Sequence, residues 1–388
     1  PQSVASVGVA TSQVTNGALT PYTDLHNAAS QALGSGSYSI STITIGTLFG
    51  DLSANGEISK AFERFVQNRG IVRDKLQAAN PSFTPTGSNT PTGFYSYNSQ
   101  DVLLPAFLDA YWGHSSDDYK ADKFDPFAKI PLPNWTVQYN GLADLPGIRN
   151  VFRSFTLNHA YSSVYNLGSY TTTTNYEQYP EFAGGVGPGS VPYLRNSTGQ
   201  YVPYYVIGQV SFLESLAPLI GVNFQTNNNV TGRVDYRTSR AIALNITNAQ
   251  VTELHTDELV IGLGYSARGL KVPFRIGGEQ RTLKNTLSAR LDLSIRDNYT
   301  VQRSILGVVD PQDVDPNNPQ SVASVGVATS QVTNGALTVQ MRPTIDYLLN
   351  ARLNLQFYFT QTITQPRVSN AFRNATSEGG IQLRYSLQ

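Results

Sequence analysis

Apolar and polar residues alternate with a period of two along most of the second half of the chain. In the stretch LSARLDLSI, every odd position from Leu287 to Ile295 is apolar and every even position is polar. Successive side chains of a β-strand point to opposite faces, so this alternation predicts strands with one apolar and one polar face. The pattern recurs in residues 155–167, 230–237, 353–359 and 381–387.

Short turn signals separate these stretches. They lie at Asn227-Asn228-Asn229, Gly277-Gly278-Glu279 and Leu349-Asn350-Ala351. Connections this short join antiparallel neighbours, because a parallel crossover needs a much longer segment. The sequence therefore predicts an all-β chain of about a dozen antiparallel strands between residues 37 and 388.

A period of three to four residues is found in one place. Between residues 57 and 80, Ile58, Phe62, Phe65, Val72 and Leu76 fall on one side of a helical projection. We predict an amphipathic helix over 57–80, inside an insertion spanning 50–133. Its apolar stripe is expected to cover neighbouring structure, with a partner-binding helix as the alternative.

A 20-residue segment occurs twice. PQSVASVGVATSQVTNGALT occupies residues 1–20 and again 319–338, with different flanking sequence. A functional repeat recurs with its flanks, so we interpret the first copy as a duplication or assembly scar within an irregular segment, 1–36. The second copy is expected to belong to a long loop, 306–334, with a tight turn at Asn334-Gly335. The absence of an initial Met leads us to expect a fragment or a processed product.

Two architectures fit the alternation: a soluble β-sandwich and an outer-membrane β-barrel. Apolar stretches near the 9 to 11 residues that cross a bilayer, and tyrosines near strand ends, favour the barrel. The predicted fold is thus an antiparallel transmembrane β-barrel segment, part of a large barrel, over residues 37–388. Its expected lumen-facing residues are Arg233, Asp235, Arg237, Arg290, Asp292, Arg352 and Arg384. Its expected lipid-facing residues are Leu287, Leu291, Leu293, Ile295, Leu353, Leu355, Phe357, Phe359, Leu383 and Tyr385.

Composition and motifs narrow the function. Twenty-seven basic and 27 acidic residues cancel, so nothing favours binding to nucleic acid. The chain has no cysteine, and its four histidines are not spaced as metal ligands. No nucleophile elbow, phosphate loop or dinucleotide fingerprint occurs. We predict a protein that is not an enzyme, with no catalytic or metal-binding residue and no cofactor.

Several long segments resemble one family. These are KIPLPNWTVQYNGLADLPGIRNVFRSFTLNHAYSSVYNLGSY from Lys129, NSQDVLLPAFLDAYWG from Asn98, and VPYYVIGQVSFLESLAPLIGVNFQTNNNVTGRVDYRTSRAIALNITNAQVTEL from Val202. Together with ELVIGLGYSARGLKVPF, LDLSIRDNYTV and residues 347–387, they are similar in order to the C-terminal barrel region of the SprA (Sov) family. That family forms the outer-membrane translocon of type IX secretion and acts in gliding motility in Bacteroidota.

The resemblance implies a location and partners. It implies a giant protein-conducting channel in the bacterial outer membrane, embedded in outer-membrane lipid, that exports folded cargo proteins bearing C-terminal sorting domains to the cell surface. The implied partners include a PorV-type shuttle barrel and a periplasmic plug protein. A C-terminal slice of such a barrel is expected to leave its sheet open. Two alternatives stay open: a surface β-sandwich adhesin and a small-solute porin.

Overall fold

The fold was analysed in a computed structural model of the chain. The structure describes residues 6–10, 35–49, 59–79, 95–121, 124–173, 200–276, 279–305, 329–350, 352–369 and 371–385, although not the side chains of 6–10, 270–284 and 350. Most of the predicted loop 306–334 therefore lies outside the described residues.

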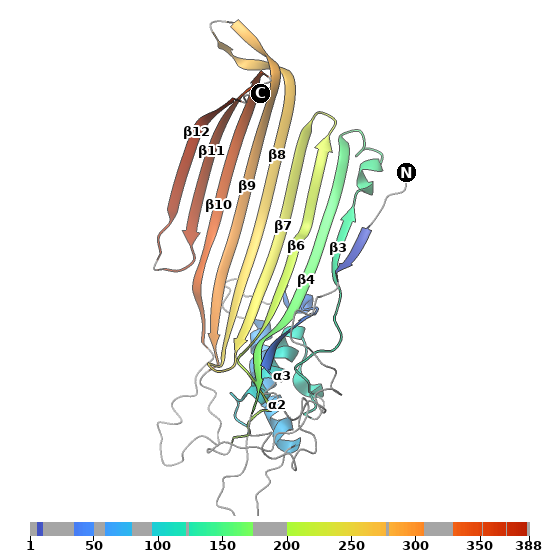
Figure 1. Ribbon diagram of the computed structural model, residues 1–388, viewed down its shortest axis with the longest axis vertical. Helices are drawn as coiled ribbons and strands as arrows, with labels where there is room; N and C mark the ends of the chain where they lie inside the picture. The colour runs from blue at the N-terminus through green and yellow to red at the C-terminus, as the bar shows by residue number, and fades with distance from the viewer. Residues whose placement is uncertain are drawn as a thin grey trace, which may run out of the picture.

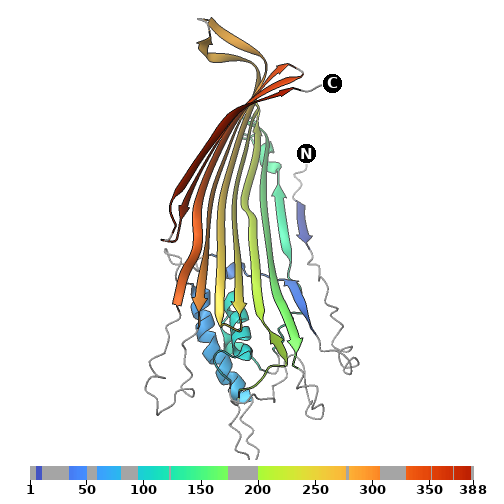
Figure 2. The ribbon, with the colours of Figure 1, turned by 60° about the vertical axis from the view of Figure 1, so that its left-hand side comes forward.

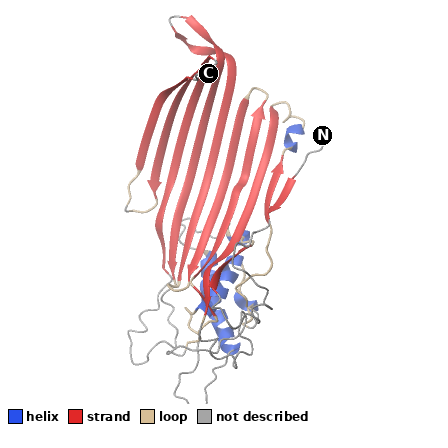
Figure 3. Ribbon diagram, viewed as in Figure 1, coloured by secondary structure: helices blue, strands red, loops and turns tan. Residues whose placement is uncertain are grey.

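One antiparallel sheet contains all twelve described strands (Figures 1 and 3). Its main path runs β1-β3-β4-β6-β7-β8-β9-β10-β11-β12, and the short β2 and β5 each pair with β4. The strands are β1 Ser6–Ala10, β2 Ser35–Ser41, β3 Asn134–Tyr139, β4 Phe152–Thr172, β5 Tyr205–Ile207, β6 Gln209–Thr226, β7 Val230–Asn245, β8 Gln250–Ile276, β9 Glu279–Ser304, β10 Thr329–Asn350, β11 Leu353–Pro366 and β12 Asn374–Tyr385. The predicted all-β, antiparallel class is confirmed.

The turn signals of the sequence mark real hairpins. β6 ends at Thr226 and β7 begins at Val230, so the three asparagines form the connection. The glycine pair lies in sequence between β8 and β9. Leu349 and Asn350 of the third signal still belong to β10, so only residues 351–352 separate β10 from β11. The sheet is not closed: β1 pairs only with β3 at one edge and β12 only with β11 at the other. An open sheet agrees with the expectation that followed from the resemblance.

Two α-helices interrupt the strands in the described part of the chain, where one was predicted. The first, α2 (Lys60–Ala79), confirms the amphipathic prediction for 57–80. The second, α3 (Gln100–Trp112), was missed because its residues are buried on nearly every side and show no apolar stripe. Its ends do carry signals: Ser99 stands at the N-cap, and Gly113 follows the last turn with φ of 91°.

The helices pack against one end of the sheet (Figures 1 and 2). We call α2, α3 and the short turns η1 (Ile45–Thr47) and η2 (Ser116–Asp118) the helical unit. Phe107 of α3 lies at its centre, 5.7 Å by ring centroids from both Phe65 of α2 and Phe212 of β6. All three rings are at most 1% exposed. The stripe of α2 thus covers neighbouring structure, as expected.

The N-terminal segment is not irregular throughout, which corrects the prediction for 1–36. Within the first copy of the repeated segment, β1 (Ser6–Ala10) pairs with β3, with Gly8 opposite Thr136. The alternation in SVGVA is too short to be distinguished from a loop without its partner strand. β2 also begins at Ser35, slightly before the predicted boundary.

The second copy contradicts the predicted turn and the end of the predicted loop. Residues 329–334 belong to β10, and Asn334-Gly335 lies within that strand. The register with β9 shifts between Val332 and Asn334, and Gly335 has φ of 155° with its Cα facing Tyr299. A Cβ on Gly335 would lie 2.7 Å from the Asn298 carbonyl oxygen. The glycine therefore belongs to a β-bulge and not to a hairpin turn. The long neighbouring strand β9 favours the bulge, because it pairs with residues on both sides of Gly335.

Truncation of the central ring tests how the helical unit is held. We expect Phe107→Ala to destabilise the attachment of the unit by about 3–5 kcal/mol, because a buried aromatic is replaced by a cavity. In the full-length protein, the unit should become cleavable by protease at a lower urea concentration.

Phe372→Ala is the matched control, since that ring is 91% exposed and should be nearly neutral. Equal protease resistance in both variants would contradict the central role of Phe107.

Candidate functional site

The predicted lipid-facing residues share one face of the sheet. Residues directly opposite on paired strands lie on the same face, as do residues two apart on one strand. Leu293 is opposite Met341, Tyr347 is opposite Leu355, and Leu355 is opposite Leu383. All ten predicted residues follow this parity. We call this the apolar face, and it includes Val234, Leu259, Ile261, Leu263, Leu337, Val339 and Ile345 as well.

Six of the seven predicted lumen-facing residues, all except Arg352, share the opposite, polar face. Arg233 and Asp292 both pair with Gly262, and Arg384 is opposite Asn354. Arg352 lies in the turn just before β11. The structure thus groups the residues as the sequence did. What each face contacts is not decided by the register.

Side chains of the apolar face are substantially exposed away from the helical unit. Phe357 is 40% exposed, Ile381 68% and Leu383 61%. The described strands form one sheet, so no second sheet of the described chain covers these side chains. An uncovered apolar surface of this extent marks contact with another protein or with lipid.

On the polar face, Asp235 organises a small ionic group. Its carboxylate accepts from Arg233 Nε at 2.6 Å and from Arg237 Nη2 at 3.1 Å. Arg237 also reaches Glu258 on β8 at 3.4 Å. The Asp235 residue is only 2% exposed, because an irregular part of β6 places Pro218 and Gly221 beside it. Two arginines compensate the buried charge, which would otherwise be costly.

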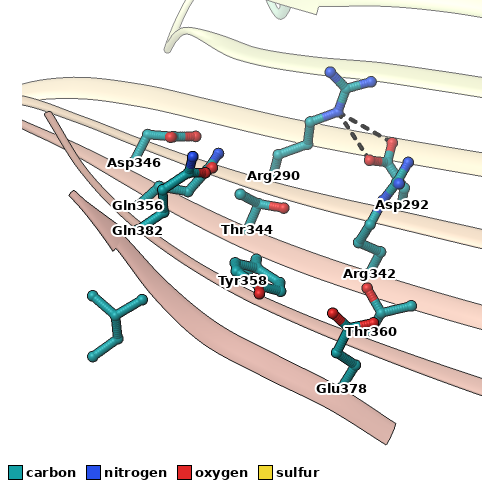
Figure 4. A pocket seen from close by; sticks show the side chains of 11 residues that line it. Arg290, Asp292, Arg342, Thr344, Asp346, Gln356, Tyr358, Thr360, Glu378 and Gln382 are labelled. Atoms are coloured by element: carbon teal, nitrogen blue, oxygen red, sulfur yellow. Dashed lines mark hydrogen bonds and ion pairs between the residues drawn. The ribbon is translucent and has the colours of Figure 1, made fainter. Parts of the chain in front are cut away.

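A shallow hollow lies on the same face and extends across the four strands β9, β10, β11 and β12 (Figure 4). It has a volume of about 840 Å³. Two arginines and three carboxylates line it, with neutral groups such as Tyr358 between them: Arg290, Arg342, Asp292, Asp346 and Glu378. The Arg290 and Asp292 side chains pair at 3.1 Å. The hollow is wet and of mixed charge, so it presents no strong preference for one sign of ligand.

A buried ion network joins the sheet to the helical unit, and sequence reasoning missed it. Glu214 and Arg240 pair at 2.7 Å, with side chains 1% and 3% exposed. Arg240 also donates to the Thr47 carbonyl at 2.6 Å and to Thr47 Oγ1 at 2.8 Å, while Tyr161 donates to Glu214 at 2.7 Å. Residues from β4, β6, β7 and η1 are thereby fixed together.

A second buried pair lies on the next strands. Glu253 of β8 accepts from Arg303 Nε at 3.2 Å and from the Tyr111 hydroxyl of α3 at 2.6 Å. Burial by itself raises the pKa of the Glu253 carboxyl, but the hydrogen bond from His255 and the Arg303 charge lower it to about 2. The charged form therefore holds α3 on the sheet.

The signal for these residues is present in the sequence. Glu214 interrupts the apolar series Val210, Phe212, Leu216, and Arg240 precedes Ile242 and Leu244 at the same parity. A charge at an apolar position of a strand needs a buried partner. The partner could not be identified from sequence, because the pairing depends on which strands become neighbours.

Other kinds of site were also sought. Among the described residues, no group of three or more His, Cys, Asp or Glu side chains is arranged to hold a metal ion. Within the same residues, neither helix is long and apolar enough to cross a membrane. No model of a known protein family matches the chain, and no curated protein matches it either.

Neutralising Glu253 tests the buried network. We expect Glu253→Gln to destabilise the packing of α3 on the sheet by about 3–5 kcal/mol, because Arg303 is left buried without a counter-charge. The folded-state pKa is below the ordinary 4.5, so the wild-type carboxyl contributes stability above that pH and loses it as the pH falls toward 2. The variant should lack this acid dependence in urea melts followed by proteolysis.

Asp292→Asn is the control, because the Arg290–Asp292 pair is exposed, at 70% and 27% for the two side chains. Exposed pairs contribute about 0–1 kcal/mol. An identical acid profile for wild type and Glu253→Gln would exclude the proposed role of the carboxylate.

Proposed function

We propose that this chain is part of a large transmembrane β-barrel that conducts folded proteins across the bacterial outer membrane. In this proposal the apolar face contacts lipid and the polar face lines the channel. Type IX secretion and gliding motility are the processes to which the SprA-like segments point.

The observation that carries the proposal is the length and exposure of the apolar face. On β9 the apolar positions run from Leu287 to Ile295, on β10 from Leu337 to Tyr347, and on β11 from Leu353 to Ile363 with the polar Gln361 as one exception. These are stretches of about 9–11 residues, the length with which a tilted strand crosses a bilayer. Aligned neighbours with apolar spans of similar length support a band at one depth.

The polar face supports a channel rather than a binding pocket. Its charges are paired with each other, as at Asp235 and Asp292, and both signs occur along it. A lining with compensated charges attracts no single class of surface strongly, which suits passage of varied cargo. Cargo with C-terminal sorting domains, a PorV-type shuttle and a periplasmic plug are proposed partners, on the resemblance alone.

No observation favours the two alternatives. An adhesin sandwich would need a second layer over the apolar face, and the described strands form a single sheet. A small-solute porin would share the two-faced wall, so the experiment below separates it by cargo size.

Neighbouring cysteine substitutions test the proposal, because the chain contains no cysteine. The substitutions are made in the full-length protein, in outer membranes, in a background that has no other accessible thiol. Arg290→Cys should then react with a water-soluble maleimide. Leu291→Cys should react only with a lipid-soluble reagent. A bulky polyethylene-glycol maleimide on Arg290→Cys should then reduce surface delivery of a folded reporter that carries a sorting domain.

Three results would count against the proposal. Release of the protein from membranes without detergent would exclude a transmembrane barrel. Equal labelling of both sites by the water-soluble reagent would remove the lipid-facing assignment. A bulky adduct that slows entry of small solutes but leaves reporter export unchanged would favour the porin.

A further inference from the structure

We infer that the helical unit lies outside the barrel wall, against the lipid head groups at one membrane surface, and not inside the channel. The inference rests on the proposed function, since it takes the apolar face as the lipid-facing one. It concerns where the helical unit lies relative to the membrane. The length and composition of the insertion do not reveal this position.

The first step is that the helical unit and the apolar face share one side of the sheet. The β7–β8 register is continuous from Val230 opposite Tyr265 to Asn245 opposite Gln250. The β8–β9 register is likewise continuous from Gln250 to Arg268. Strand parity is therefore preserved along this part of the wall.

The contacts then assign the side. Glu253, bound to α3 through Tyr111, has the same parity as Leu259, Ile261 and Leu263. On β7, Arg240, bound to η1, has the same parity as Tyr236 and Val234. The Tyr236 hydroxyl bonds Asp257 at 3.3 Å, which confirms that no reversal of faces occurs between the unit and the apolar residues.

The second step is the border between them. Asp257 and Asp297 are opposite each other on β8 and β9. Arg367 donates to Asp297 at 2.8 Å and lies 4.8 Å from the centre of the Tyr299 ring. A row of charged and tyrosine side chains therefore separates the apolar band from the helical unit. This is the composition of a membrane–water interface.

The third step identifies which end of the helical unit points toward this border. The α3 C-terminus is there, since Tyr111 reaches Glu253 while Gln100 bonds Tyr205 and Ile207 at the far end. The α2 N-terminus is there too, since Arg303 lies 5.3 Å from the centre of the Phe62 ring. The helix pair thus stands with one end toward the membrane surface.

Two exposed side chains at this end fit head groups. Phe49 follows η1 and is 52% exposed, although most aromatic rings of the unit are buried. Lys60 begins α2 and is also exposed. Arg240, which binds Thr47, and Tyr236 are four residues apart on β7, a distance of about 13 Å along the strand. An exposed ring and a lysine that close to the apolar band are suited to anchor at the interface.

The consequence concerns the channel. A unit on the outer surface does not cover the polar face, so the unit cannot act as a plug attached to this part of the wall. It instead supports the long strands where they continue beyond the bilayer.

Depth-dependent quenching tests the position. Full-length protein in phosphatidylcholine vesicles carries a single fluorophore at Phe49→Cys or, as a second site, Lys60→Cys. We expect loss of emission with lipids spin-labelled on the head group. The matched control is a fluorophore at Asp118→Cys. Asp118 is exposed and lies near Lys75, which is about 22 Å further along α2 than Lys60. Emission from this control should not be quenched.

Leu291→Cys and Arg290→Cys separate the inference from the proposed function. Leu291→Cys should be quenched by acyl-chain spin labels and Arg290→Cys by neither lipid. Loss of Leu291→Cys quenching would overturn the proposed function, and the inference with it. Quenching at Leu291→Cys with none at Phe49→Cys or Lys60→Cys would overturn the inference alone.

Discussion

The pairing of β7, β8 and β9, which has no register shift between Gln250 and Arg268 of β8, is the constraint on which the rest of the structure depends. Strand side chains alternate between faces, so a register without a shift fixes the face of every residue along the strand. The same strands carry the buried network at one end and the apolar residues further along. Both features therefore lie on one side of the sheet, and the charged residues that alternate with the apolar positions, such as Arg233 and Asp292, lie on the other.

The buried network explains how a two-helix insertion stays in place on such a wall. Ion pairs that are almost fully buried are costly unless every partner is present. Here the partners come from five strands, from η1 and from α3, with Arg240 at the centre of one group and Glu253 at the centre of the other. Apolar packing around Phe107 supplies burial, and the ion pairs specify where the helices attach.

The contrast between the two faces of the sheet is what supports the proposed channel. The polar face compensates its own charges, as in the Arg233, Asp235 and Arg237 group. The apolar face has exposed rings and aliphatic side chains such as Phe357 and Leu383. A wall of this kind is stable only where lipid or another apolar surface covers one side. That requirement supports the proposed membrane location more directly than any single residue does.

The sequence by itself determined the strands, the hairpin turns and the division of residues between two faces, because these follow from local period and turn chemistry. It also located α2, whose stripe is visible as a pattern. Only the tertiary structure decided α3, whose all-round burial hides its period, and the strand pairing of Ser6–Ala10 and of Asn334-Gly335. The partners of Glu214 and Glu253, and the side on which the helices stand, depend on contacts between residues far apart in the chain. No local pattern records such contacts.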